Sequence, residues 1–233
     1  MTPVAVVTGG AGAIGRALVA SFAADGFCVH AVDRSEEVRD VAGGAGGVGH
    51  VLDVTDEAAV ASLGELARVD VLVNGVGAWP LMSFDDLTPA RWRASTEVNL
   101  SSAYLTTWTC RNALRAASGA VVNVTSAVAL KGHPEMIHYA AAKAGLIGLT
   151  RALALALGPD GVRVNAVAPG LVQTEGNDEV WTPERRAAFR ATRALPLDIG
   201  VDDVVATIRH LASPQARAIT GQTVVVDGGT VLH

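Results

Sequence analysis

The sequence predicts an α/β protein built as a doubly wound parallel sheet with helices on both faces. Short apolar runs recur along the chain without polar alternation, segments of helical period separate them, and a glycine-rich turn follows the first run. Strands that are apolar on both sides belong in a sheet that helices cover on both faces. Strand and helix in regular alternation indicate that the strands are parallel.

Six apolar runs are the expected strands, at residues 4–7, 29–32, 71–73, 121–124, 162–167 and 223–227. The expected helices lie between them, at residues 15–25, 57–67, 89–117, 139–158 and 202–212. The glycine run 43–49 precedes another strand-like segment, and we expect a shortened connection there, with the second crossover helix trimmed. No linker is visible, so residues 1–233 are expected to form a single domain. Residues 174–196 show no strand pattern and are expected to form a substrate lid.

The composition excludes several classes of protein. Of 233 residues, 50% are hydrophobic and 18% are charged, so the chain can bury a core and is not intrinsically disordered. A net charge of -5 gives no basic surface for nucleic acid or anionic membranes. The longest apolar stretch contains Lys143 and Arg151, which favours a buried helix over a membrane span.

Cysteine usage and the start of the sequence indicate a cytosolic protein. Cys28 and Cys110 lie far apart in apolar surroundings, with no metal-ligand spacing around either, so we expect reduced core thiols and no metal site. The first ten residues reach a glycine cluster without the basic start and apolar run of a signal peptide.

A glycine-rich turn connects the first expected strand to the first helix. Its backbone amides, at the positive end of the helix dipole, could approach a pyrophosphate. The spacing differs from G-x-G-x-x-G, and a tight turn kept only for packing is the alternative. The turn reads Thr8, Gly9, Gly10, Ala11, Gly12, Ala13, Ile14, Gly15.

Acidic residues end the second and third expected strands. Asp33 could accept hydrogen bonds from an adenosine ribose and would repel a 2'-phosphate. NAD is therefore favoured over NADP, although Arg34 could pair with that phosphate. Asp53, followed by Val54, is expected to end the third strand, where an acid could meet the adenine. A plain helix cap for the segment from Thr55 is the alternative.

Ser126, Tyr139 and Lys143 form the clearest catalytic constellation. Tyr139 and Lys143 stand four residues apart, on one face of a helix. A phenol with a pKa of about 10 is a poor base at neutral pH. An ammonium group one turn away, with a positive nicotinamide ring, would stabilise the phenolate and make it usable as an acid or base. The alternatives are a Tyr–Lys pair that merely packs and a serine that only ends a strand.

These motifs together resemble the short-chain dehydrogenase/reductase family over essentially the whole chain, and the resemblance implies a Rossmann fold. The family pattern TGxxxGxG matches residues 8–15, with Ala13 as a departure, and YxxxK matches residues 139–143. Looser matches are the NAG-type motif at 74–77, the active-site Asn at Asn99, PG at 169–170 and ITGQ...VDGG at 219–229. Gly75 also departs from the pattern, because the family often has a second Asn there that steadies the loop.

The resemblance implies a role for each matching residue. Tyr139 would exchange the proton with the substrate and Ser126 would hydrogen-bond the substrate oxygen. Lys143 would bind the nicotinamide ribose and lower the tyrosine pKa, and Asn99 would hold a water of the proton relay. The implied cofactor-binding residues are Gly9, Gly12, Ala13, Ile14, Gly15, Asp33, Asp53, Val54, Asn74, Gly75, Tyr139, Lys143, Pro169, Gly170, Val172 and Thr174.

The expected substrate pocket is mainly apolar, which favours a small, apolar or aryl secondary alcohol or ketone. Its expected residues are Trp79, Ser126, Val128, His133, Tyr139 and Trp181. The segments AWPLMSFDDLT and DGGTVLH are similar to NAD-dependent family members that act on phenyl-substituted secondary alcohols. Alternatively, Trp79, Trp181 and Phe189 only pack the lid against the body. His138 is expected to orient its neighbour rather than to act as a base.

The overall prediction is an NAD(P)-dependent alcohol dehydrogenase or ketoreductase with a small-molecule substrate. The helix at 139–158 is apolar around most of its circumference and needs a further cover. The resemblance implies a second subunit there, usually in a tetramer. Two alternatives share the fold. A nucleotide-free relative that dehalogenates halohydrins would give up the glycine turn and the lysine, and a non-enzymatic NAD-sensing protein would have little reason to keep Ser126, Tyr139 and Lys143 together.

Overall fold

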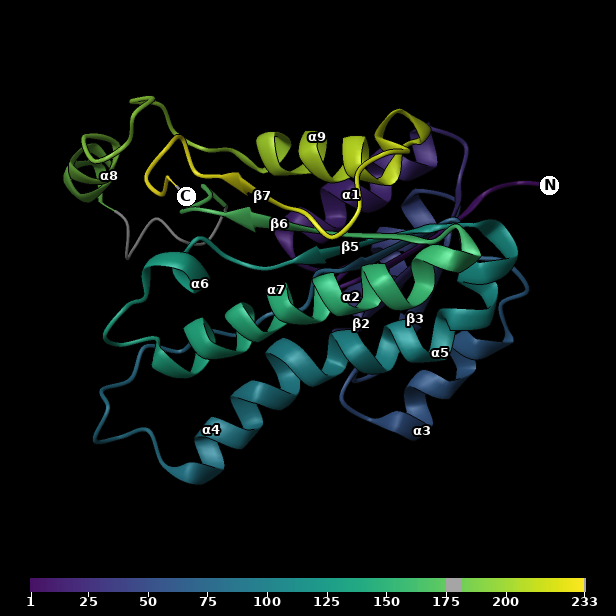
Figure 1. Ribbon diagram of the computed structural model, residues 1–233, viewed down its shortest axis with the longest axis horizontal. Coiled ribbons are helices and arrows are strands. Elements are labelled where there is room, and N and C mark those ends of the chain that lie inside the picture. Colours follow the sequence, from purple (N-terminus) through teal and green to yellow (C-terminus); the bar gives the residue numbers. More distant parts are fainter. Residues whose placement is uncertain (175–181, 233) are drawn as a thin grey trace.

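In the computed structural model, which describes residues 1–174 and 182–232, seven strands form one parallel sheet (Figure 1). Its order is β3-β2-β1-β4-β5-β6-β7, so the chain winds outward from β1 in both directions. This confirms the predicted doubly wound Rossmann fold. The strands are β1 (Val4–Thr8), β2 (Cys28–Asp33), β3 (Val48–Val51), β4 (Val71–Asn74), β5 (Ala120–Val124), β6 (Arg163–Pro169) and β7 (Thr223–Val226).

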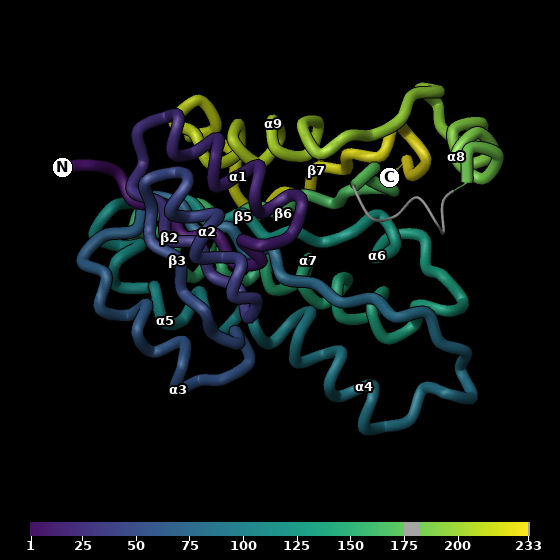
Figure 2. The backbone as a smooth tube through the Cα atoms, turned by 180° about the vertical axis from the view of Figure 1, so that it is seen from behind, coloured from purple at the N-terminus to yellow at the C-terminus, as the bar shows by residue number. Residues whose placement is uncertain are grey.

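Helices cover both faces of the sheet (Figure 1). One face packs on α1 (Ala13–Ala24), α2 (Glu37–Gly44) and α9 (Val201–Ala212). The other packs on α3 (Glu57–Val60), α5 (Ser102–Ala117) and α7 (Ile137–Leu157), with α4 (Pro89–Thr96) beside α7. Two short helices, α6 (Val128–Lys131) and α8 (Pro183–Arg190), lie beyond the carboxyl ends of the strands. The chain starts at the opposite end of the molecule (Figure 2).

Two apolar clusters, one on each face, form the core. Alternate residues of β1 illustrate the division: Ala5 and Val7 belong to the cluster under α1 and α9, and Val6 belongs to the cluster under α5 and α7. Cys110 is buried in the second cluster, where burial raises the pKa of its thiol to about 12. Cys28 is also unpaired, but it is only partly buried rather than a core residue.

The second crossover helix, α2, is present but short, which agrees with the expected shortened connection. α2 has 8 residues, and the glycine run forms its end and the turn into β3. A Cβ at Gly47 would lie 2.4 Å from the carbonyl oxygen of Val29, and one at Gly49 would lie 2.6 Å from the Cα of Arg39. The glycines are therefore needed for the close packing of β3 against β2 and α2.

Two predicted helices are divided. The segment predicted at 57–67 contains α3 and then the 3-10 helix η1 (Ala61–Glu65), which includes Gly64, a weak helix former. The segment predicted at 89–117 contains α4, the π-helical segment η2 (Glu97–Ser101) and α5. The widened turn in η2 lies beside the candidate active site.

The stretch Ile137–Asp160 is long and apolar enough to cross a membrane, by length and composition alone. In the structure α7 lies along β6 and buries Leu146, Ile147 and Leu157, together with the basic residue Lys143. This packing agrees with the interpretation as a core helix.

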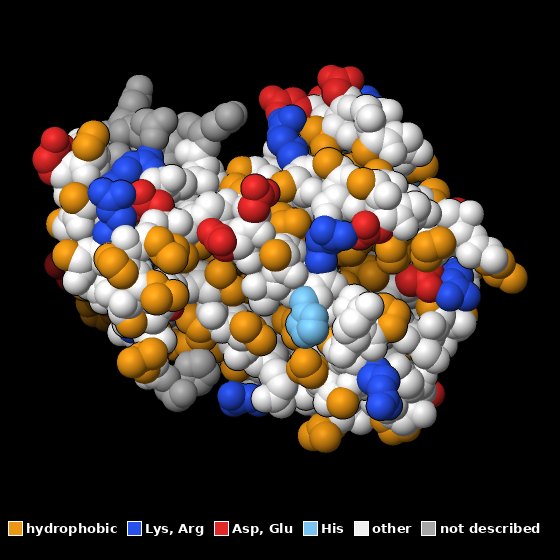
Figure 3. Space-filling model, turned by 90° about the horizontal axis from the view of Figure 1, so that it is seen from above, with side chains coloured by type: hydrophobic (Ala, Val, Ile, Leu, Met, Phe, Trp, Pro, Cys, Tyr) orange, Lys and Arg blue, Asp and Glu red, His pale blue; other side chains and the backbone are white. Residues whose placement is uncertain are grey.

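On the face that α1 and α9 form, acidic and basic side chains are interspersed (Figure 3).

Candidate active site

The glycine turn brings together the carboxyl ends of β1 and β4. Gly9 has φ +75°, which favours glycine, and a Cβ there would lie 3.0 Å from the carbonyl oxygen of Gly75. Gly15 lies in the first turn of α1, and a Cβ there would lie 2.0 Å from the carbonyl oxygen of Gly9. Because any side chain at Gly15 would push α1 away from the turn, the backbone geometry itself requires glycine.

The N-terminus of α1 opens toward the same end of the sheet. Its N-cap, Gly12, makes no side-chain cap bond, and no acidic residue lies in the first turn. The positive end of the helix dipole and these uncapped amides fit a pyrophosphate. Ala13 and Ile14 begin the helix, and among the described residues the one non-glycine with positive φ is Ser118. The methyl group of Ala13 therefore carries no backbone penalty.

Asp33, the last residue of β2, lies at the edge of the glycine turn. Its carboxylate accepts hydrogen bonds from the backbone N–H of Ala11 at 3.1 Å and of Ser35 at 3.0 Å. The acid is thereby held next to the turn, where a ribose of a dinucleotide would lie. Arg34 follows it and is exposed, so the acid that favours NAD and the base that favours NADP are neighbours.

Asp53 does not end the third strand, and this prediction is wrong. β3 ends two residues earlier, and Asp53 lies in an exposed turn before the buried Val54. Hydrogen bonds from the backbone and hydroxyl of Thr55, with the nearby charge of Arg34, lower the pKa of Asp53. The helix-cap alternative is also wrong, because the N-cap of α3 is Asp56.

Asn74, the last residue of β4, turns its side chain into the core. Its amide donates to the Oδ1 of Asn123 at 2.8 Å and to the hydroxyl of Thr107 at 3.1 Å. Any contact of Asn74 with a nucleotide would therefore come from its backbone. At Gly75, a Cβ would lie 2.6 Å from the carbonyl oxygen of Thr8. The departure from the family pattern at Gly75 thus permits a close approach of two strand ends.

Ser126, Tyr139 and Lys143 meet at the carboxyl end of β5. Ser126 hydrogen-bonds the hydroxyl of Tyr139, and both side chains are buried. The Nζ atom of Lys143 lies 5.8 Å from the centre of the Tyr139 ring. It donates to the carbonyl oxygens of Val124 at 2.9 Å and Val76 at 3.0 Å. The structure thus brings together the three residues that the sequence singles out.

Burial governs the ionisation of this group. It raises the pKa of Tyr139 to about 12, against a smaller lowering by the hydrogen bond from Ser126. Burial also lowers the pKa of Lys143 to about 7. The expectation that Lys143 lowers the tyrosine pKa is therefore not met by the chain alone. It needs the ammonium form of the lysine together with a second positive charge, such as an oxidised nicotinamide ring.

Asn99 lies in η2, where the wider π-helical turn aims its side chain at the segment after β4. Its Oδ1 accepts from the N–H of Ala78 at 3.0 Å, and its Nδ2 donates to the carbonyl oxygen of the same residue at 2.9 Å. Nδ2 also donates to the carbonyl oxygen of Ser95 at 3.0 Å. Asn99 is thus an anchor for this segment, and its contact with a relay water stays a prediction.

The segment after β6 follows the carboxyl end of a strand that β4 and β5 separate from β1 in the sheet. Pro169 ends the strand, and a Cβ at Gly170 would lie 2.6 Å from the Cβ of Asp227. Val172 forms a parallel bridge with the segment before α9. Thr174 is the last residue described before 175–181. These residues stand where the resemblance puts the nicotinamide side, and their contacts with a cofactor stay predictions.

Two of the expected substrate residues, Trp79 and Val128, contact the catalytic group. The ring centre of Trp79 is 6.0 Å from that of Tyr139, with the planes tilted by 57°. Val128 begins α6, and its N–H donates to the hydroxyl of Ser126. His133 lies in the turn between α6 and α7. Trp181 lies outside the described residues.

The described part of the expected lid packs on the body of the protein. The ring centre of Phe189, on α8, lies 5.2 Å from the Nζ atom of Lys131 on α6. It lies 5.4 Å from the guanidinium carbon of Arg193. Arg193 is buried and donates to the carbonyl oxygen of Leu171 at 3.0 Å. The contacts of Phe189 agree with the alternative that it packs the lid.

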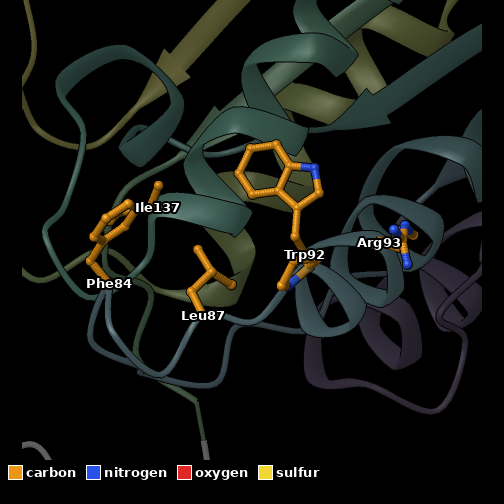
Figure 4. A pocket seen from close by; sticks show the side chains of 6 residues that line it. Phe84, Leu87, Trp92, Arg93 and Ile137 are labelled. Carbon is orange, nitrogen blue, oxygen red and sulfur yellow. The ribbon is translucent and has the colours of Figure 1, made fainter.

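A separate apolar hollow of about 370 Å³ lies outside this group of residues. Figure 4 shows Phe84 and Ile137 close together beside Leu87, with Trp92 next to them. None of the residues that the sequence predicts for the site lines the hollow. Its lining is Phe84, Leu87, Pro89, Trp92, Arg93 and Ile137.

The sequence does not single out several buried polar residues that lie beneath the site. Asn123 of β5 donates to the hydroxyl of Thr150 on α7 at 2.9 Å. The hydroxyl of Thr125 donates to the carbonyl oxygen of Lys143 at 2.7 Å. These hydrogen bonds hold α7, which carries Tyr139 and Lys143, against the carboxyl end of β5. The signal in the sequence was a polar residue inside the otherwise apolar strand at 120–124.

Known proteins resemble the chain over almost its whole length. A family model described as enoyl-(acyl carrier protein) reductase matches residues 9–231. An uncharacterized short-chain type dehydrogenase/reductase of Sinorhizobium fredii is 40% identical over 97% of the chain, which spans 43% of that relative. A cis-4-hydroxycyclohexanecarboxylate dehydrogenase of Sinomonas cyclohexanicum is 38% identical, over 97% of the chain and 95% of the relative. The crystal structure of a short-chain dehydrogenase/reductase family oxidoreductase from Burkholderia thailandensis superposes with a TM-score of 0.90 at 35% identity, covering 99% of this chain and 93% of that one.

Proposed function

This chain belongs to the short-chain dehydrogenase/reductase family, and we propose that it is an NAD-dependent enzyme that interconverts a small secondary alcohol and a ketone. The proposal starts from the family assignment, which supports an oxidoreductase that acts on alcohols or sugars. The observation that carries the finer proposal is the buried contact between Ser126 and Tyr139, with Lys143 one turn away. This group lies at the carboxyl ends of the strands, as does the uncapped helix N-terminus.

The chain's own residues would bind and orient the substrate and move one proton. A nicotinamide dinucleotide, when bound, supplies or accepts the hydride. Ser126 would donate a hydrogen bond to the substrate oxygen, and the Tyr139 hydroxyl would give or take the proton at that oxygen. Because burial raises the pKa of Tyr139, the phenolate needs positive charge beside it. Lys143 in its ammonium form would provide one such charge, and an oxidised nicotinamide ring would provide the second.

Asp33 supports a preference for NAD. Its carboxylate is fixed beside the glycine turn by two backbone amides. An acid there can accept hydrogen bonds from ribose hydroxyls and repels a phosphate at the 2' position. Arg34 is exposed next to it and supports the opposite preference. We favour NAD because the acid, unlike the arginine, is held in place.

The apolar surroundings support a cyclic or aryl substrate. Trp79 lies beside Tyr139 and is 52% exposed, so its ring is available for contact. Flat and cyclic apolar groups pack well against an aromatic face. One relative carries the name cis-4-hydroxycyclohexanecarboxylate dehydrogenase, and the substrate in that name contains a secondary alcohol on a ring.

A second copy of the chain is the proposed cover for the outer face of α5 and α7. α5 exposes the stacked rings of Tyr104 and Trp108, and α7 exposes Leu155 at 82%. An apolar face of this kind is typical of a subunit interface. Size-exclusion chromatography with light scattering should show a tetramer that Trp108→Glu dissociates, while Val48→Glu on the sheet edge leaves it intact. A monomeric wild-type protein would contradict the assembly.

The enzymatic proposal is tested by combining binding with turnover. NADH and NADPH are titrated by tryptophan fluorescence, and a panel of aryl, cyclic and methyl ketones is screened for oxidation of NADH. We expect tighter binding of NADH and turnover of at least one ketone. Binding without turnover would favour an NAD-sensing protein instead. Halide release from a halohydrin without nucleotide would favour the dehalogenase alternative.

A further inference from the structure

The segment 76–82, which follows β4 and carries Trp79, is held at every second residue. The carbonyl oxygen of Val76 accepts from Nζ of Lys143 at 3.0 Å. Ala78 exchanges two hydrogen bonds with the side chain of Asn99, at 3.0 and 2.9 Å. The first two anchors of the segment are therefore residues that the site already contains.

His138 supplies the next anchor. Its Nε2 lies 3.1 Å from the carbonyl oxygen of Pro80, and its Nδ1 lies 2.7 Å from the hydroxyl of Ser95. A carbonyl can only accept, so Nε2 carries the hydrogen and Nδ1 accepts from the Ser95 hydroxyl. That hydroxyl accepts in turn from Nδ2 of Asn99 at 3.2 Å. Both ring nitrogens are engaged and the residue is only 1% exposed, so His138 is not placed to act as a base.

The last anchor joins the end of the segment to the turn before α7. The N–H of Met82 donates to the carbonyl oxygen of Glu135 at 2.9 Å. Main-chain groups of residues 76, 78, 80 and 82 are thus all bonded to α7, to η2 or to the turn that precedes α7. A segment with no helix or strand hydrogen bonds of its own is held in one conformation by its neighbours.

Trp79 stands between the two residues that Asn99 and His138 anchor. Its ring centre lies 6.0 Å from that of Tyr139, and half of the residue is exposed to solvent. The hydrogen bonds on both sides of it fix the backbone from which the indole projects. The position of the ring relative to the catalytic hydroxyl therefore depends on these bonds.

We propose that His138 is a positioning residue that sets substrate selectivity. By holding Pro80, it keeps the indole of Trp79 beside Tyr139, so that a flat or cyclic group next to the reacting carbon is favoured over a methyl group. This inference rests on the proposed function. Lys143 and Asn99 hold the same segment but also belong to the proposed proton relay. Replacing His138 can therefore change substrate selectivity without removing a residue of that relay.

The kinetic test compares acetophenone with acetone in the presence of NADH. His138→Leu removes both hydrogen bonds, whereas the amide of His138→Gln can still donate to Pro80. We expect His138→Leu to lower kcat/KM for acetophenone about tenfold, with little change for acetone, and His138→Gln to recover most of the loss. His210→Leu, on the exposed side of α9, is the matched control and should change neither value. Equal losses on both ketones would overturn the proposal.

A double-mutant cycle tests whether His138 acts through Trp79. In a Trp79→Ala background, His138→Leu should leave the ratio of kcat/KM for the two ketones unchanged, because the ring that it positions is gone. An effect as large as in the wild-type background would overturn the proposal, since His138 would then act by another route.

A readout that needs no turnover separates this inference from the proposed function. In protein labelled with fluorotryptophan, the fluorine resonance of Trp79 is identified by its absence in Trp79→Phe. It should shift or broaden in both His138→Leu and Ser95→Ala. An unchanged resonance overturns the positioning role, even in an active enzyme. A changed resonance in a protein that reduces no ketone supports the positioning and contradicts the proposed function.

Discussion

The nucleotide side and the catalytic side of the candidate active site are formed by different kinds of groups. On the nucleotide side, backbone groups form the site, because Gly9 and Gly15 leave room for the turn and for α1. On the catalytic side, buried polar side chains such as Lys143 and His138 hold the segment that faces the substrate. The first side is therefore sensitive to an added methyl group, and the second is sensitive to the loss of a polar group.

The largest effect of this difference is expected at Gly15. An added Cβ would lie 2.0 Å from the carbonyl oxygen of Gly9, so Gly15→Ala must displace α1. We expect a loss of stability of about 1–3 kcal/mol and at least about tenfold weaker NADH binding. Thermal unfolding and fluorescence titration measure both. Gly43→Ala is the matched control, because nothing lies within 4 Å of an added Cβ there. Normal NADH binding by Gly15→Ala would mean that the turn is not the nucleotide site.

A smaller effect is expected at Asp33, a side chain on the nucleotide side. Asp33→Asn removes the charge that repels a 2'-phosphate while keeping the shape of the side chain. The ratio of the dissociation constants for NADPH and NADH should fall about tenfold. Asp40→Asn, an exposed acid on α2, should leave the ratio unchanged. If the ratio does not move in Asp33→Asn, cofactor choice lies elsewhere, and Arg34→Ala is the next variant to measure.

The smallest effect concerns stability on the catalytic side. The pKa of Lys143 is about 7 in the folded protein and about 10.4 in an unfolded chain, so between these values the unfolded state binds more protons. The free energy of unfolding should therefore rise as the pH rises through this window. Lys143→Met removes this contribution. The raised pKa of Tyr139 acts in the opposite direction, but only above about pH 10.

Thermal unfolding of both proteins between about pH 7 and about pH 9.5 measures this contribution. The wild-type midpoint should rise relative to that of Lys143→Met as the pH increases. Parallel curves would show that the lysine keeps an ordinary pKa in the folded protein.

The same difference between the two sides decides what could be predicted from the sequence. The strands, the glycine turn and the Tyr139–Lys143 spacing are local patterns, and the structure has all of them. The hydrogen bond between His138 and Ser95 joins residues that lie 43 positions apart in the sequence, so no spacing in the sequence indicates it. Asp53 was misplaced because its strand ends early, at a turn that its own side chain stabilises.

The most direct test of the central claim is the activity of Tyr139→Phe. The claim is that the buried phenol beside Ser126 and Lys143 carries the proton to and from the substrate oxygen. The variant keeps the ring and loses the hydroxyl, so kcat should fall by about 10²–10⁴ while the affinity for NADH stays nearly unchanged. Full ketone reduction by Tyr139→Phe would contradict the account, because another group would then have to move the proton.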